Sequence, residues 1–122
     1  MAHDIATDET TRLIASNKVE GTAVYNRQGD RLGSIYNFMV DKMSGKVEYA
    51  VLSFGGFLGL GQDYYPLPWS MLTYDTSQGG YVVDLDKSIL QDAPHYSEDS
   101  EPTHDREYSR QVYDYYGVTY PW

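Results

Sequence analysis

The side chains best suited to acid–base or metal chemistry are few in this chain and lie far apart. Its three histidines are His3, His95 and His104, and all of them lie in polar segments outside the apolar middle of the sequence. A histidine that transfers protons or binds a metal must be held in a fixed geometry. We therefore interpret these three residues as surface histidines that take no part in catalysis or metal binding.

Two short motifs have part of the spacing of known ion or phosphate sites. Segment 84–88 reads Asp-x-Asp-x-Ser, like the start of a calcium loop, but Ile89 stands where a glycine is needed and His95 where a glutamate is needed. Segment 59–61 reads Gly-Leu-Gly, but no Lys-Ser or Lys-Thr pair follows to complete a phosphate-binding loop. We expect neither a calcium site nor a phosphate site.

Nucleophiles and paired carboxylates give no stronger signal. No serine lies within the pattern of a nucleophile elbow. Asp41 and Glu48 could meet across a hairpin, but Asp41 precedes a Ser-Gly turn, where its side chain can accept backbone N–H bonds. We predict that the chain is not an enzyme and has no catalytic, metal-binding or cofactor-binding residue.

Charge and composition exclude further classes. The 122 residues include 9 Lys and Arg, 18 Asp and Glu and no cysteine, with a net charge of −9. Such a chain repels phosphate backbones and anionic lipids, so we expect no direct binding of nucleic acid. Disulfides and thiolate metal sites are excluded. With no signal-peptide pattern and no run of about 18 apolar residues, we predict a cytoplasmic protein without a membrane span.

Short β-type runs separated by turn residues dominate the middle of the chain. They predict strands over residues 21–25, 32–41, 46–54, 64–67, 72–75 and 81–85. No βαβ rhythm is present, so the fold class is all-β: a small six-stranded antiparallel barrel filled by its own side chains. The predicted core includes Val24, Ile35, Val51, Leu67 and Val83.

Two local features complete the barrel. In the second predicted strand Ile35 lies on one face while Phe38 and Val40 lie on the other, which predicts a bulge near residues 36–37. Segment 86–91 reads as a helical turn that ends the domain.

Segment 54–69 is a glycine-rich apolar loop that runs into a Pro-Leu-Pro-Trp corner. Four glycines in seven residues provide unusual backbone freedom. A flexible linker would be polar, so we expect Phe57, Leu58 and Leu60 to be docked. Their docking site is either the barrel itself or another protein.

The last part of the chain combines an acidic segment with many aromatic residues. Residues 95–105 have the composition of a solvated linker. The helical spacing that follows predicts a short helix with Asp105 as N-cap and Gly117 as its stop. This aromatic tail packs either on its own barrel or on a second subunit or different protein, since interfaces favour Tyr and Trp anchors.

Five fragments occur in an order that resembles the PRC-barrel family over roughly residues 16–95. They are Gly29-Asp-Arg-Leu-Gly33, Asp41-Lys-Met-Ser-Gly45, Val47–Phe54, Pro66-Leu-Pro-Trp69 and Ala93-Pro94. The glycine loop is similar to that of stand-alone bacterial members. Other members are domains of the photosynthetic reaction centre H subunit and of the ribosome maturation factor RimM. The resemblance implies a six-stranded barrel with a docking or assembly role, and it carries over no catalytic residue. The residues that mark the fold are Gly33, Asp41, Gly45, Gly55, Gly56 and Pro68.

We therefore predict a polar leader over residues 1–15, a PRC-barrel domain over 16–95 and an acidic, aromatic extension over 96–122. The predicted function is a non-enzymatic protein–protein interaction or assembly module with a basic partner and with pairing into a homodimer. The candidate interaction surface consists of Phe57, Leu58, Leu60, Trp69, Tyr113, Tyr115, Tyr116 and Trp122. The alternatives are a RimM-like ribosome maturation or RNA-processing adaptor and a small-molecule binder at the cleft between the glycine loop and Trp69.

Overall fold

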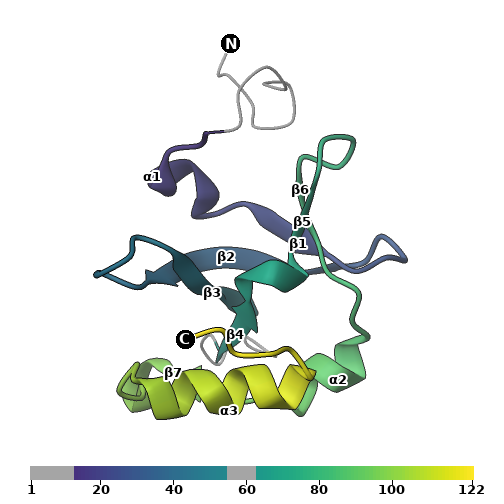
Figure 1. Ribbon diagram of the computed structural model, residues 1–122. Helices are drawn as coiled ribbons and strands as arrows, with labels where there is room; N and C mark the ends of the chain where they lie inside the picture. Colours follow the sequence, from purple (N-terminus) through teal and green to yellow (C-terminus); the bar gives the residue numbers. More distant parts are fainter. Residues whose placement is uncertain (1–12, 55–62) are drawn as a thin grey trace.

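The computed structural model describes residues 13–54 and 63–122 (Figure 1). Its elements, in chain order, are α1 (Ser16–Val19), β1 (Ala23–Tyr25), β2 (Arg31–Val40), β3 (Val47–Phe54), β4 (Asp63–Pro68), η3 (Trp69–Met71), β5 (Thr73–Asp75), β6 (Gly80–Val82), α2 (Lys87–Gln91), β7 (Tyr96–Ser97), η4 (Glu98–Ser100) and α3 (Arg106–Tyr116). The described strands form a single sheet in the order β5-β6-β1-β2-β3-β4-β7. The predicted mainly β fold is confirmed.

Two details of the sheet differ from the prediction of six antiparallel strands. β1 and β6 pair in parallel, with Val24 opposite Tyr81. A seventh strand, β7, pairs with β4, with Tyr96 opposite Tyr64. An exposed sheet edge offers unpaired N–H and C=O groups to any nearby backbone, and β7 pairs with these groups along β4. The start of the predicted linker is therefore part of the sheet.

The predicted bulge in β2 is present. Ile35 pairs with Leu52 and Asn37 with Val51, so the register shifts between them and Tyr36 is left without a partner in the ladder. The extra residue reverses which side chains face inward. Ile35 is buried, whereas Tyr36 is 53% exposed.

The described residues form two apolar clusters in the interior, one on each face of β3. The main cluster includes Ala50 and Leu52 of β3 and the buried α2 residue Leu90. The second contains Tyr49, Val51, Tyr64 and Tyr96. The five predicted core residues Val24, Ile35, Val51, Leu67 and Val83 are all buried, which confirms that prediction.

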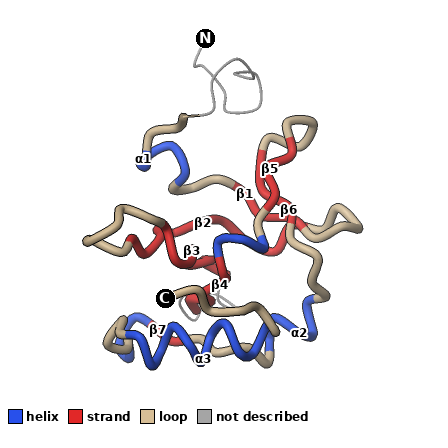
Figure 2. The backbone as a smooth tube through the Cα atoms, in the orientation of Figure 1, coloured by secondary structure: helices blue, strands red, loops and turns tan. Residues whose placement is uncertain are grey.

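Helix α3 covers the second cluster and has both predicted end signals. The Asp105 side chain accepts a hydrogen bond from the backbone N–H of Tyr108 at 2.9 Å. Gly117 has a φ of 69°, the left-handed conformation that ends many helices. Val112, on the inner side of α3, is fully buried. In Figures 1 and 2, α3 lies beneath the sheet and its C-terminal end lies beside α2.

The fold-marking residues within the described ranges have distinct structural roles. A Cβ on Gly33 would collide with the backbone oxygen of Ser53 on the neighbouring strand. Gly45 has a φ of 79° in the turn between β2 and β3. Asp41 caps the same turn through its side chain, and the buried Pro68 ends β4. Gly55 and Gly56 lie outside the described residues.

Candidate interaction surface

The predicted surface residues have different environments. Phe57, Leu58 and Leu60 lie outside the described residues. Trp69 is half-buried and its ring packs against Phe38 and Tyr81, with ring centroids 6.0 and 5.7 Å apart. The Trp69 ring thus contributes to the chain's own packing.

The prediction that Tyr113 is a surface residue is wrong. Tyr113 is 3% exposed, and its hydroxyl donates a hydrogen bond to the backbone oxygen of Glu48 in β3. It lies on the inner side of α3, so it anchors the helix to the sheet. Burial, the main cause, raises its pKa to about 12.

The other aromatic residues of the extension also contact their own chain. Tyr116 is half-buried against the main cluster, and burial raises the pKa of its hydroxyl. Trp122 is half-buried with its ring 5.6 Å from that of Tyr120. The Tyr120 hydroxyl donates to the Glu48 carboxylate at 3.2 Å. The sequence left open whether the tail packs on its own barrel or on another protein. In these contacts the tail packs on its own barrel.

Among the predicted aromatic surface residues that the structure describes, Tyr115 remains exposed, at 40%. Its hydroxyl donates to the backbone oxygen of Ile89 in α2 at 2.6 Å, which joins the C-terminal turn of α3 to α2. Ile89 is itself 43% exposed. An open groove of about 600 Å³ lies beside this contact and is lined by Asp92, Ala93, Pro94, His95, Gln111, Asp114 and Tyr115. We name it the α2–α3 groove.

The α2–α3 groove combines negative charge with apolar walls. Asp92 and Asp114 are exposed carboxylates, and no lysine or arginine is among its described lining residues. The His95 ring stacks on Tyr65, with centroids 4.8 Å apart, and its Nδ1–H donates to the Ala93 oxygen at 2.8 Å. Since His95 and Tyr115 are both held by such contacts, two walls of the groove are preformed.

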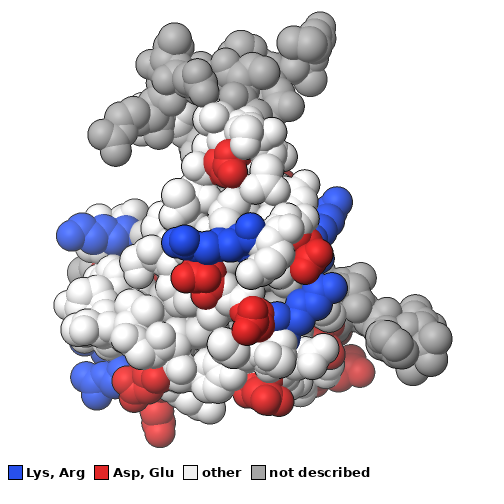
Figure 3. Space-filling view, turned by 90° about the vertical axis from the view of Figure 1, so that its right-hand side faces the viewer, with Lys and Arg blue, Asp and Glu red and all other residues white. Residues whose placement is uncertain are grey.

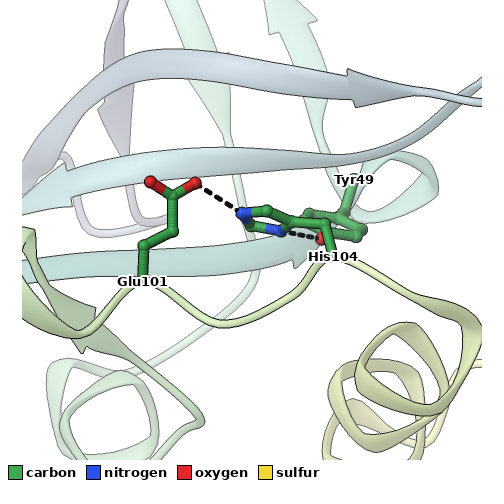
Figure 4. Close-up of polar contacts among 3 residues, drawn as sticks. All are labelled: Tyr49, Glu101 and His104. Carbon is green, nitrogen blue, oxygen red and sulfur yellow. Dashed lines mark hydrogen bonds and ion pairs between the residues drawn. The ribbon is translucent and has the colours of Figure 1, made fainter.

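His104 has a fixed geometry, so interpreting it as a loose surface histidine is wrong. Its Nδ1 lies 2.5 Å from the Tyr49 hydroxyl and its Nε2 lies 2.7 Å from Glu101 Oε2 (Figure 4). A protonated tyrosine hydroxyl donates to Nδ1, which leaves the hydrogen on Nε2 to be donated to the carboxylate. The His104 side chain is 13% exposed.

The order carboxylate, imidazole, hydroxyl is that of a catalytic triad, but the hydroxyl is enclosed. Tyr49 is 1% exposed. Burial, with the nearby Tyr108 hydroxyl, raises the pKa of Tyr49 well above its ordinary value of 10. A hydroxyl that stays protonated and out of contact with solvent is a poor nucleophile. We conclude that these contacts fasten segment 101–105 to β3.

Sequence reasoning missed this triad for a physical reason. Glu101 and His104 are only three residues apart in the sequence. Tyr49, however, is 55 residues from His104 and belongs to a strand whose partners lie elsewhere in the sequence. No local pattern connects the two.

Charges of both signs are interspersed on the side of the molecule that carries α2, and among the described residues no continuous basic patch covers that face (Figure 3). Within residues 13–54 and 63–122, no group of three or more His, Asp or Glu side chains is arranged to hold a metal ion. None of the described helices has the length and apolar character needed to cross a bilayer.

Comparison with known proteins identifies the domain family of this chain. A sequence model described as the PRC-barrel domain matches residues 12–90. None of the curated proteins compared with the chain matches it. The similar solved structures include the 16S ribosomal RNA processing protein RimM from Pseudomonas aeruginosa, with 19% identity and a TM-score of 0.42. That match covers 66% of this chain and 49% of the RimM chain, so the chain spans about half of its length. Because the family match extends over more than half of the sequence, the chain belongs to the PRC-barrel domain family.

Proposed function

We propose that this protein is a non-enzymatic interaction module that binds a basic segment of a protein partner in the α2–α3 groove. The observation that carries the proposal is the composition of the groove: two exposed carboxylates, no cation among the described lining residues, and an aromatic wall at Tyr115. Complementary charge steers partners into contact and selects among them.

A lysine or arginine side chain of the partner suits both parts of this groove. Its aliphatic stem would lie along Pro94 and Tyr115, and its charged end would approach Asp92 or Asp114. Exposed ion pairs contribute only about 0.2–1 kcal/mol each. Affinity would therefore come from several contacts, with apolar area beside Ile89 contributing to the total.

A non-enzymatic role is supported by the state of the groups that could carry chemistry. The Glu101–His104–Tyr49 contacts end in a hydroxyl that is 1% exposed. The groove itself offers carboxylates on an open surface. Catalytic carboxylates work in sites that hold the reacting group and exclude water, which an open groove does not do.

The test is co-purification from source cells with two forms of the protein as bait. The first is the wild-type chain, and the second carries Asp92→Lys and Asp114→Lys. We expect the wild-type chain to retain basic proteins that mass spectrometry identifies, and the doubly substituted chain to lose them. Identical capture by both forms would overturn the proposal. A double substitution of exposed acids outside the groove, Glu20→Lys with Asp99→Lys, controls for the change in net charge.

A ribosome-linked role is a narrower version of the same proposal. In that case the occupant of the groove would be a basic ribosomal protein, since an acidic surface repels RNA phosphates. This role would be supported if the wild-type chain co-sediments with ribosomal particles at low salt and the variant with Asp92→Lys and Asp114→Lys does not. The small-molecule alternative beside Trp69 stays a prediction, because its glycine-loop side lies outside the described residues.

A further inference from the structure

The turn between β2 and β3 is a second unusual surface of this acidic protein. Met43 at its tip is 90% exposed, and Val40 at the end of β2 is 46% exposed. Lys42 and Lys46 lie on either side of Met43 in the sequence, and neither lysine has an ion-pair partner within the described part of the chain. We name residues 42–46 the hairpin tip. It combines positive charge with an exposed apolar side chain.

Hydrogen bonds to Asp41 stabilise the hairpin tip. Asp41 Oδ2 accepts from the Ser44 hydroxyl at 2.6 Å, and its carboxylate also accepts from the backbone N–H groups of Met43 and Ser44. The bond from Ser44 is the main cause that lowers the pKa of Asp41. The backbone N–H of Gly45 donates to the backbone carbonyl oxygen of Asp41 at 2.7 Å and so closes the turn. An ordered tip loses little conformational freedom on binding.

The hairpin tip and the α2–α3 groove lie at opposite ends of the molecule. Figures 1 and 2 show the turn between β2 and β3 on one side and α2, with the C-terminal end of α3, on the other. A molecule therefore cannot place its own tip in its own groove. Contact between the two surfaces requires a second copy of the chain.

We propose that the hairpin tip of one copy docks into the α2–α3 groove of another. Lys42 and Lys46 would face Asp92 and Asp114, and the Met43 thioether would lie against the Tyr115 ring. Methionine sulfur makes favourable contacts with aromatic rings, and its flexible side chain adapts to irregular apolar surfaces. The inference rests on the proposed function, because it names the occupant of the same groove.

Salt dependence alone would not test this contact. Each copy carries a net charge of −9, so two copies repel one another at long range while the tip and the groove attract locally. Added salt weakens both effects. Reversing the charges of the tip or of the groove distinguishes the local attraction from the long-range repulsion, because each reversal changes the local contact in a predictable direction.

The experiment is analytical ultracentrifugation of the full chain from about 1 μM to about 1 mM. We expect the wild-type mass to rise above the 13.9 kDa of one chain with increasing concentration. A groove variant (Asp92→Lys, Asp114→Lys) and a tip variant (Lys42→Glu, Lys46→Glu) should each weaken association at least about tenfold. Mixing these two variants should restore association, since the basic tip of one then meets the acidic groove of the other.

The outcomes separate this inference from the proposed function. A wild-type chain that stays monomeric throughout, or variants that associate as strongly as wild type, would overturn the inference. If the wild-type chain is monomeric while capture of a basic protein still depends on Asp92 and Asp114, the inference fails and the proposed function stands. If reversing these residues changes neither self-association nor capture, both fail. Circular dichroism of each variant confirms that it is folded. Glu20→Lys with Asp99→Lys controls for the change in net charge of the groove variant, and the mixture of the two variants tests the tip variant against a complementary partner.

Discussion

The Tyr49 hydroxyl lies 2.5 Å from Nδ1 of His104, although the two residues are 55 positions apart in the sequence. This contact joins a buried strand of the barrel to the acidic segment that precedes α3. Because Glu101 accepts from the other ring nitrogen at 2.7 Å, both sides of the imidazole are occupied. The barrel and its C-terminal extension are thus one packed unit in this region.

Loss of the imidazole should destabilise the protein. In His104→Ala the Tyr49 hydroxyl would stay buried without this acceptor, which costs about 1–3 kcal/mol. Urea unfolding followed by circular dichroism measures the free energy of unfolding. In the double-mutant cycle, Tyr49→Phe should remove most of the cost of His104→Ala, because the hydroxyl that needs a partner is then gone. Additive effects of the two substitutions would contradict this account.

Gly33 should tolerate a methyl group poorly. The Cβ of Gly33→Ala would collide with the backbone oxygen of Ser53, which cannot move without disturbing the ladder between β2 and β3. We expect a loss of about 1–3 kcal/mol in the free energy of unfolding. Gly45→Asn is the matched control, since a side chain there meets open space and asparagine adopts positive φ more readily than most residues. Equal costs for the two variants would show that the close approach at Gly33 is unimportant.

Stability should fall at high pH. Burial raises the pKa of Tyr108 and of Tyr113 to about 12, above the ordinary value of 10. The unfolded chain therefore releases these protons first, so their contribution to stability is complete below pH 10 and is lost as the pH rises toward 12. Tyrosinate absorbance and circular dichroism recorded together should show the buried tyrosines ionising as the fold is lost. Full ionisation of all tyrosines near pH 10 with the fold intact would contradict the described burial.

Removing the N-cap of α3 should loosen the extension. Asp105→Ala deletes the acceptor for the Tyr108 N–H and should cost about 0.5–2 kcal/mol of stability. Hydrogen exchange of the α3 amides should accelerate as the first turn opens. Asp99→Ala, an exposed acid of the preceding 3₁₀ turn, is the control for loss of charge. Unchanged exchange in Asp105→Ala would show that the helix does not depend on this cap.

Local patterns predicted much of the fold because local physics determines those parts. The break in apolar alternation between Ile35 and Phe38 predicted the bulge, and Asp105 and Gly117 predicted the two ends of α3. The parallel pairing of Val24 with Tyr81 could not be predicted in this way, because the partners come from strands far apart in the chain.

The site was harder to predict than the fold, because it depends on contacts between residues that lie far apart in the chain. The aromatic residues of α3 share a composition that suits either an interface or a core. Which of them faces the sheet depends on the rotation of the helix against β3. The sequence therefore placed Tyr113 and Tyr115 on one surface, whereas the structure buries the first and exposes the second. Asp92 and Asp114, 22 positions apart in the sequence, line one groove only once α3 has docked beside α2.

The central claim, that the α2–α3 groove recognises a basic protein segment, is tested most directly by nuclear magnetic resonance. The ¹⁵N-labelled wild-type chain would be titrated with a short lysine- and methionine-containing peptide, and a peptide with glutamate in place of lysine would serve as control. We predict that amide shifts change with the basic peptide at Asp92, His95, Gln111, Asp114 and Tyr115, and that these changes disappear with Asp92→Lys and Asp114→Lys. Shift changes spread over all acidic surfaces, or equal changes with the glutamate peptide, would contradict the claim.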